Sequence, residues 1–451
     1  MKALVFERSL PRFAAARVAS ALTAGGGARV GPLRLADVEP PALPGPGWHR
    51  LRPRLAGICG SDLATVDGQS SRWFEPVVSF PFVPGHEVVG DLDDGSRAVL
   101  EPVLACAARG IDPACAACAR GDTGSCERIA FGCLQPGLQT GYCADTGGGW
   151  SGGLVAHESQ LHPVPDGMSD QAAVMVEPAA CAVHAVQNAG IADGDTVVVL
   201  GAGTLGLCAV AAVRHLARPG ALIAGAKHPE QRRLARALGA GTVAAPSEVR
   251  RSVRRQTQSL AMDGQLTGGA DVVIDCVGSE SSLRESLAVV RPRGAVVLVG
   301  MPGPVNVDLT PLWQREVRLV GSYAYRHATF ATAFELVAAA GLERLVSALY
   351  PLEEWRDAID HAVHAGPRGA VKIAFDLRPR PGAASGRRAE LGPRSGETAG
   401  TAPGGDGDPA SGRRAGLGPR SGETAGTAPG GDGDPASGRR AGLGPRSGET
   451  A

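Results

Sequence analysis

The sequence has no excess of charge of either sign, because 45 lysines and arginines balance 45 aspartates and glutamates among its 451 residues. A nucleic-acid-binding protein normally carries a basic surface, so this balance argues against one. The sequence also has no uninterrupted run of 18 apolar residues, so it predicts no membrane-spanning helix. Residues 1–7 hold only a short apolar stretch and are predicted to be a first strand rather than a signal peptide. These absences favour a cytoplasmic protein.

Aromatic residues are scarce, at 4% of the chain, whereas glycine (64 residues) and proline (34 residues) are abundant. Part of this imbalance is local, because residues 384–409 recur as residues 410–435 with one difference, and an incomplete third copy follows. Leu417 is the only large apolar residue of the second copy. Such a unit cannot bury enough apolar surface to offset the entropy lost on ordering, so residues 379–451 are predicted to form a disordered repeat tail.

The remaining chain divides into parts with different patterns of apolar residues. Residues 1–165 contain short β-like runs, such as 77–83 and 87–91, and no long helical period, which is typical of a β domain with functional loops. Residues 195–300 alternate apolar strands with helical segments, which indicates a doubly wound parallel sheet. Residues 323–378 hold two helical patterns and a last strand. We therefore predict an α/β protein with one domain over 1–165, completed by 323–378, and a second over 166–322.

A glycine-rich loop follows the first strand of the second domain. The strand at 196–200 runs directly into the motif Gly201-Ala202-Gly203-Thr204-Leu205-Gly206, and a helical run follows. This is the context in which such a motif binds a dinucleotide. Gly201 permits a tight turn, Gly203 lets the backbone approach a diphosphate, and Gly206 allows close packing of helix on strand. The free N–H groups at the start of the helix favour the negative charge of the diphosphate.

The end of the next strand indicates which dinucleotide binds. An NAD site usually presents Asp or Glu there to the adenosine ribose. In this chain the strand at 221–224 is followed by Ala226, Lys227 and His228, with Arg232 in the next helix. Because cations replace the acidic residue, a 2′-phosphate would be attracted, and NADP is favoured over NAD.

Three of the ten cysteines, Cys115, Cys118 and Cys126, lie close together in a segment without hydrophobic periodicity. Cys106 precedes them by nine residues. Four clustered thiolates in a cytoplasmic protein most simply bind a structural zinc, whereas a disulfide in this segment is the weaker interpretation. Asp112, three residues before Cys115, is an alternative fourth ligand.

A second set of candidate metal ligands is dispersed. Cys59 lies in Gly57-Ile58-Cys59-Gly60-Ser61-Asp62, His86 and Glu87 follow Pro84-Gly85, and Glu177 opens the helical stretch that leads to the second domain. Cys, His and carboxylate side chains are the ligands of a catalytic zinc that keeps one position open for water or substrate.

Together these motifs resemble the zinc-dependent medium-chain alcohol dehydrogenases, especially the branch of threonine, sorbitol and glucose dehydrogenases. The resemblance covers residues 1 to about 376 and rests on both metal-ligand sets and the glycine motif. It implies a GroES-like β-barrel domain that carries both zincs, a Rossmann domain inserted after it, and dimers or tetramers joined through the Rossmann sheet.

The resemblance also implies the roles of single residues. Cys59, His86 and Glu87 would hold the catalytic zinc, Glu177 would bind it directly or through its water, and Asp62 would orient His86. Ser61 would pass the proton of the alcohol outward while hydride moves to the nicotinamide. The family often has a histidine five residues after the zinc cysteine as the last proton carrier, and here that position is Ala64.

The function that this implies is hydride transfer between an alcohol and NAD(P), with polyols, sugars or amino alcohols as the favoured substrates. A zinc-free quinone or enoyl reductase would not need Cys59, His86 and Glu87, so their presence weighs against it. A noncatalytic cofactor-sensing protein is a further alternative. Trp73, Phe74, Glu101 and Trp150 are candidate pocket residues by position.

The cofactor assignment can be tested by replacing Ala226 with Asp. A carboxylate would bind the ribose hydroxyls of NAD and repel the 2′-phosphate of NADP, so the ratio of kcat/KM for NAD to that for NADP should rise by at least about tenfold. An unchanged ratio would show that this strand end does not select the cofactor.

Overall fold

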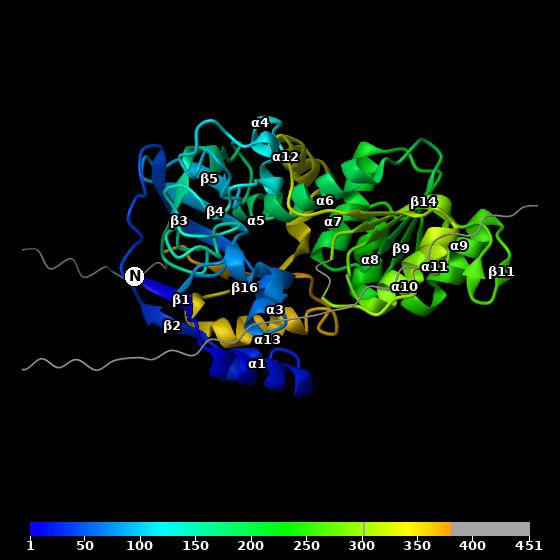
Figure 1. Ribbon diagram of the computed structural model, residues 1–451, viewed down its shortest axis with the longest axis horizontal. Helices are drawn as coiled ribbons and strands as arrows, with labels where there is room; N and C mark the ends of the chain where they lie inside the picture. Colours follow the sequence, from blue (N-terminus) through cyan, green and yellow to red (C-terminus); the bar gives the residue numbers. More distant parts are fainter. Residues whose placement is uncertain (301–302, 380–451) are drawn as a thin grey trace, which may run out of the picture. The chain divides into compact units, whose positions relative to one another are not determined.

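The computed structural model describes residues 1–300 and 303–379 (Figure 1). Within these residues, the two large sheets are a parallel sheet of six strands and a mainly antiparallel sheet of seven strands, and two further sheets have two strands each. The predicted disordered repeat tail lies outside these residues, apart from Pro379. Across the described ranges we find no helix with the length and apolar character needed to cross a bilayer.

A parallel sheet of six strands forms the second half of the described chain, in the order β10-β9-β8-β13-β14-β15. The expected alternation of strands and helices is confirmed, with strands β8 (Thr196–Leu200), β9 (Ala221–Gly225), β10 (Thr242–Ala244), β13 (Ala270–Asp275), β14 (Val290–Leu298) and β15 (Arg318–Gly321). The helices are α6 (Val176–Ala189), α7 (Thr204–Leu216), α8 (Pro229–Ala237), α9 (Val249–Thr257), α10 (Glu280–Val289), α11 (Thr310–Gln314) and α12 (Thr329–Ala340). A small hairpin, β11 (Ala261–Met262) and β12 (Gln265–Leu266), follows α9.

Both faces of this sheet are covered. Val197 and Val199 belong to the apolar cluster that includes α6, α7 and α12, whereas Val198 and Leu200 pack with α9 and α10. Because successive strand residues point to opposite faces, a strand covered on both sides must be apolar throughout. This explains the unbroken run Thr-Val-Val-Val-Leu in β8.

The other sheet has seven strands and is mainly antiparallel. Its order is β16-β17-β3-β4-β5-β7, and β6 pairs with β3. The strands are β3 (Trp48–Gly57), β4 (Val88–Leu92), β5 (Arg97–Leu100), β6 (Leu154–His157), β7 (Leu161–Pro163), β16 (Val346–Tyr350) and β17 (Lys372–Asp376). Among the described strands none pairs β16 with β7, so the sheet is open rather than a closed barrel. The predicted combination of a β domain with a doubly wound parallel sheet is confirmed, whereas the described strands of the first domain do not close into the predicted barrel.

Short helices and 3-10 turns form the loops and the segments next to β16 and β17 of the seven-stranded sheet. They are the helices α4 (Ala116–Ala119), α5 (Asp170–Ala173) and α13 (Trp355–Val363), and the 3-10 turns η1 (Arg72–Val77), η2 (Thr123–Ser125), η3 (Glu158–Gln160), η4 (Pro246–Glu248), η5 (Leu342–Leu345) and η6 (Leu352–Glu354). The β-like run at 77–83 is therefore not a regular strand. Pro76, Pro81 and Pro84 lack the N–H groups that a strand ladder needs.

The N-terminal strand β1 (Lys2–Phe6) pairs with β2 (Leu33–Asp37), and two helices that the sequence did not predict lie between them. These are α1 (Leu10–Leu22) and α2 (Gly27–Val30). The backbone after α1 is fastened to the end of α3 (Gly60–Val66), because the Asp67 carboxylate accepts hydrogen bonds from the N–H groups of Gly25 and Gly27, each at 3.0 Å. Helix α1 is rich in alanine and has no regular apolar stripe, so periodicity could not reveal it.

The glycine loop after β8 has a strict packing requirement. A Cβ on Gly206 would collide with the carbonyl oxygen of Gly201, whereas a Cβ on Gly203 would meet nothing within 4 Å. Gly201 itself has φ +87°, in the left-handed region. The sequence requirement at Gly206 is therefore steric and exists before any ligand binds.

This difference predicts losses of stability of different size for two alanine variants of the protein without cofactor. Gly206→Ala should lower the free energy of unfolding by about 2 kcal/mol, because helix and loop must move apart. Gly203→Ala, the matched control, should lose only about 0.5 kcal/mol as a poorer helix N-cap. Urea unfolding measures both, and equal losses would contradict the steric explanation.

Candidate active site and metal centres

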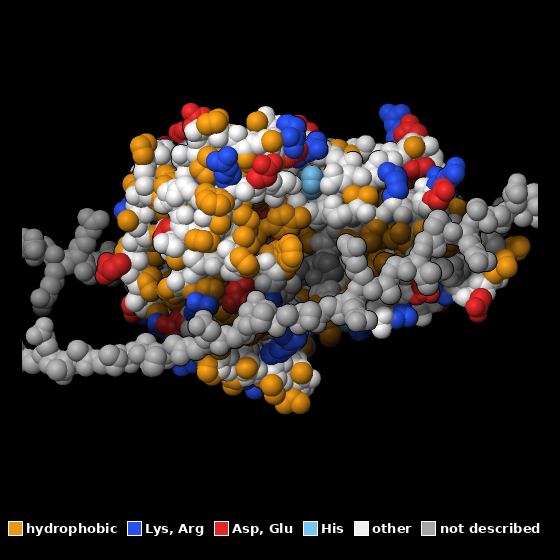
Figure 2. Space-filling model, viewed as in Figure 1, with side chains coloured by type: hydrophobic (Ala, Val, Ile, Leu, Met, Phe, Trp, Pro, Cys, Tyr) orange, Lys and Arg blue, Asp and Glu red, His pale blue; other side chains and the backbone are white. Residues whose placement is uncertain are grey.

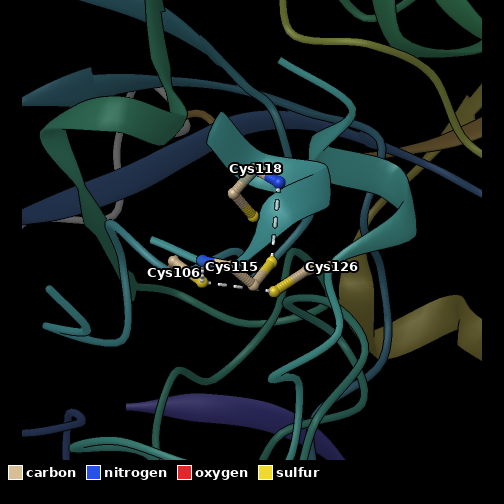
Figure 3. Close-up of side chains that lie close together, drawn as sticks. All are labelled: Cys106, Cys115, Cys118 and Cys126. Atoms are coloured by element: carbon tan, nitrogen blue, oxygen red, sulfur yellow. Dashed lines mark hydrogen bonds between the residues drawn. The ribbon is translucent and has the colours of Figure 1, made fainter. Parts of the chain in front are cut away.

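The four cysteines of the loop between β5 and β6 come together. The sulfur atoms of Cys106, Cys115, Cys118 and Cys126 all lie within 4.8 Å of one another (Figure 3). The sulfurs of Cys106 and Cys126 are 3.7 Å apart. Zinc–sulfur bonds of about 2.3 Å in a tetrahedron place sulfurs about 3.8 Å apart, so the group fits a tetrahedral zinc.

Backbone N–H groups surround these sulfurs. Cys118 and Glu127 donate to the Cys115 sulfur, each at 3.5 Å, and Arg128 donates to the Cys126 sulfur at 3.4 Å. Although burial acts to raise it, the donors from Cys118 and Glu127 together with Cys106 lower the pKa of Cys115 to about 6, whereas burial raises the pKa of Cys126 to about 11. A thiolate is the form that binds metal, and such donors stabilise it.

The structure distinguishes the two candidates for the fourth position. Cys106 is buried within the group, whereas Asp112 is exposed and lies outside it. Binding of zinc by these four thiols remains a prediction, with Cys106 as the ligand that the geometry favours.

The dispersed ligand candidates lie around one large cleft of about 1580 Å³. Cys59, Ser61, His86, Glu87 and Glu177 line it, together with the glycine loop at 203–206. Residues separated by more than 100 positions in the chain therefore reach a common space.

The start of α3 positions Cys59. Cys59 is the N-cap of this helix, and the Asp62 carboxylate accepts a hydrogen bond from the Cys59 N–H at 3.0 Å. The other Asp62 oxygen lies 3.4 Å from Nδ1 of His86, and both side chains are buried. Burial acts to lower the pKa of His86, but Asp62 and Cys59 raise it well above its usual range. Asp62 thus lies where it can orient the His86 ring, as the resemblance implied.

Glu87 has a partner that the sequence analysis missed. Its carboxylate forms an ion pair with the ammonium of Lys372, and Lys372 also donates to the carbonyl of Ile58 at 3.2 Å. Both side chains of the pair are only 1% exposed. A Cβ on Gly57 would collide with the Glu87 carboxylate, which explains the glycine there. The predicted role of Glu87 as a direct zinc ligand stays a prediction, and Lys372 neutralises it in this arrangement.

The sequence contains one indication of this partner. Lys372 is the single charged residue of the predicted strand at 370–375, whose other residues are apolar. A charge in such a place is buried only with a partner. The identity of that partner depends on the pairing of β17 with β3, which joins Ala374 to Gly57.

Glu177 lies in the first turn of α6 and is buried. Burial, together with the charge of Glu87, raises the pKa of Glu177 to about 7, although His86 and Lys372 oppose the shift. The Cys181 thiol donates to Glu177 Oε1 at 3.7 Å. The site therefore contains a carboxyl group that gains or loses a proton near neutral pH.

The cofactor candidates divide into two groups. Gly203, Thr204, Leu205 and Gly206 line the cleft at the start of α7, which fits a diphosphate, and Gly201 makes the turn before them. Ala226, Lys227, His228 and Arg232 follow the end of the adjacent strand β9 and do not line the cleft.

The cations after β9 are not equivalent. The Arg232 guanidinium donates to the carbonyls of Lys227 at 2.7 Å and Ala226 at 3.3 Å, so it is held over the strand end. Arg233 instead pairs with Glu230 at 2.6 Å. Lys227 is exposed and His228 half-buried.

The four pocket candidates separate in the structure. Phe74 lines the cleft, whereas Trp73 is 84% exposed and outside the lining. Trp150 is buried and donates from Nε1 to the carbonyl of Gly57 at 3.1 Å. Glu101 is away from the cleft, where one carboxylate oxygen accepts from His162 at 2.8 Å and His327 at 2.7 Å.

Comparison with known proteins shows which families and proteins the chain is similar to. Residues 45–166 match the alcohol dehydrogenase GroES-like domain model and residues 204–339 match the zinc-binding dehydrogenase model. Sorbitol dehydrogenase of Halalkalibacterium halodurans is 28% identical over 347 residues, covering 73% of this chain and 92% of that protein. D-xylulose reductase A of Aspergillus oryzae is 30% identical over 328 residues, covering 69% and 85%.

Among solved structures, a zinc-binding dehydrogenase of Sinorhizobium meliloti bound to NADP matches with a TM-score of 0.63 and 25% identity. The match covers 83% of this chain and 98% of that one.

The structure predicts which residue completes the cysteine group. Cys106→Ser should reduce the zinc content of the purified protein by about one equivalent per chain, because a serine hydroxyl is a far poorer zinc ligand than a thiolate. Asp112→Asn, the matched control, should retain all bound zinc. Metal analysis by plasma emission measures both variants, and zinc loss in the aspartate variant alone would reverse the assignment.

Proposed function

The chain belongs to the zinc-dependent medium-chain alcohol dehydrogenase family, in its sorbitol dehydrogenase-like branch, and on this basis we propose how its cleft performs the reaction. The protein is an NAD(P)-dependent oxidoreductase that acts on CH–OH groups. The observation that carries the proposal is that Cys59, Ser61, His86 and Glu177 line the same cleft as the glycine loop at 203–206.

The donor set fits a catalytic zinc. A thiol, an imidazole and buried carboxyl groups line the same cleft, and because Nδ1 of His86 lies 3.4 Å from Asp62, the other ring nitrogen is the one left for a metal. Cys59, His86 and either Glu87 or Glu177 would hold the ion. When bound, zinc supplies Lewis-acid chemistry that lowers the pKa of an alcohol hydroxyl.

The side chains of the chain itself have separate tasks. Asp62 orients His86, and the ammonium of Lys372 offsets the free-energy cost of burying the carboxylate of Glu87. Ser61 lines the cleft and would take the hydroxyl proton. Ala64, where the family often has a histidine, also lines the cleft, so the chain has no histidine there to carry the proton onward.

The N-terminus of α7 would bind the cofactor diphosphate, and we propose NADP as the preferred cofactor. Lys227, His228 and Arg232 surround the end of β9, where an acidic residue would otherwise exclude a 2′-phosphate. Similar solved structures contain NADP, NADH or NAD, so the proposal of NADP rests on the cations after β9.

The relatives are named for sorbitol and xylulose, so a secondary CH–OH group of the polyol, sugar or amino-alcohol type is the proposed reacting group. We also propose a homodimer or homotetramer in the cytoplasm. The edge strand β15 supports this assembly, because Leu319 on it is 42% exposed and Trp313 nearby is 78% exposed.

Removal of the cysteine ligand tests the function. Cys59→Ala should lower kcat by at least about a hundredfold and release one zinc per chain, because the ion loses its thiolate, while circular dichroism stays unchanged. Cys133→Ala, an exposed cysteine outside the cleft, should retain both zinc and turnover. Full activity in metal-depleted protein would refute the zinc mechanism.

A further inference from the structure

A further group of metal-ligating side chains lies outside the cleft. Glu101, His162 and His327 each contribute one ligand atom, and these atoms all lie within 4.8 Å of one another. Nε2 of His162 is 2.8 Å from Glu101 Oε2, and Nδ1 of His327 is 2.7 Å from the same oxygen. None of the three residues lines the cleft or belongs to the cysteine group. The group is therefore separate from both candidate zinc centres described above.

Distant parts of the chain build this group. Glu101 follows β5, His162 lies in β7, which pairs with β5, and His327 lies in the loop before α12, 226 residues after Glu101. The ring of His162 stacks on Phe330 of α12, with centroids 4.3 Å apart and planes inclined by 6°. The Thr123 hydroxyl donates to the other Glu101 oxygen at 3.3 Å. These contacts position the carboxylate and the first imidazole before any ion binds.

The donor set fits a borderline divalent cation such as Zn²⁺. Two imidazole nitrogens and one carboxylate oxygen suit zinc, cobalt or nickel, whereas magnesium and calcium prefer oxygen ligands alone. Ligand atoms around a tetrahedral zinc are about 3.3 Å apart, so each nitrogen has to move about 0.5 Å away from the Glu101 oxygen. His327, whose side chain is 52% exposed, lies in a loop that leaves room for this movement. Water can complete the coordination on that exposed side.

The charges near the group permit a cation. Arg326, next to His327 in the chain, pairs with Asp122 at 2.7 Å, and Arg120 approaches the same carboxylate at 3.6 Å. Figure 2 shows acidic and basic side chains side by side over α4 and α12, with histidine exposed beside them. Burial acts to raise the pKa of Glu101, but hydrogen bonds from the two imidazoles lower it. Glu101 is thus a charged carboxylate, which is the form that binds metal.

We propose that Glu101, His162 and His327 bind one zinc or similar divalent cation, as a third metal site that fastens the segment before α12 to strands β5 and β7. Each imidazole then carries its proton on the ring nitrogen that faces away from the ion. The site goes beyond the proposed function, because it touches neither the cleft nor the candidate catalytic ligands. Its expected role is to stabilise the folded chain.

Equilibrium dialysis of the full chain, purified without a histidine tag, against increasing ZnCl₂ tests the site. The last zinc equivalent bound by the wild type should bind at least about tenfold more weakly in His327→Gln, because even the partner of a ligand changes metal affinity by about 10- to 100-fold. Glutamine can still donate a hydrogen bond to Glu101, so the variant separates hydrogen bonding from metal binding. His215→Ala removes an exposed histidine of α7 as the matched control and should keep the wild-type affinity.

Two further measurements identify the ligands and the role. Cobalt added to the zinc-loaded protein should give visible d–d absorption without a thiolate charge-transfer band, because the ligands are nitrogen and oxygen. ZnCl₂ should raise the temperature of unfolding of the wild type and not that of His327→Gln.

Equal zinc affinity in the wild type and His327→Gln would overturn the proposal, as would an equal loss in His215→Ala or a thiolate band from the added cobalt. The comparison counts only the difference between variants, so it does not depend on whether the cleft holds zinc. Loss of the catalytic zinc or of alcohol oxidation would therefore leave this inference standing, and its own failure would leave the proposed function intact.

Discussion

The buried ion pair between Glu87 and Lys372 is the contact on which the rest of the site depends. Burying either charge without a partner would cost several kcal/mol of folding free energy, because each side chain is only 1% exposed. Glu87 and Lys372 must therefore be in contact in the folded protein. Lys372 lies on β17, near the end of the described chain, and also binds the carbonyl of Ile58, immediately before Cys59. The strand therefore has to return to the first domain and pair with β3, and in doing so it supports both the Cys59 loop and the Glu87 side chain.

The same constraint explains how the two sheets share one cleft. Helix α6 joins the domains, and its first turn buries Glu177 near His86 and Glu87 while the rest of the helix packs on the parallel sheet. The N-terminus of α7 faces the cleft from the other sheet. Burial at this junction raises the pKa of Glu177 to about 7.

Helix α1 adds a feature that the motifs did not indicate. None of its residues is a candidate metal ligand, yet Leu10, Phe13, Ala14 and Arg17 line the cleft. The candidate metal ligands and this part of the cleft lining are thus encoded in different parts of the chain.

The sequence by itself determined the local features. The strand at 196–200, the glycine loop, the paired cysteines 115 and 118, and the motifs around Cys59 and His86 follow from short-range patterns, because turns, strands and ligand spacing are local properties. Only the tertiary structure decided that Cys106 rather than Asp112 joins the cysteine group, that Lys372 meets Glu87, and that an alanine-rich segment becomes a wall of the cleft. Those outcomes depend on contacts between distant residues, which no periodicity or spacing along the chain records.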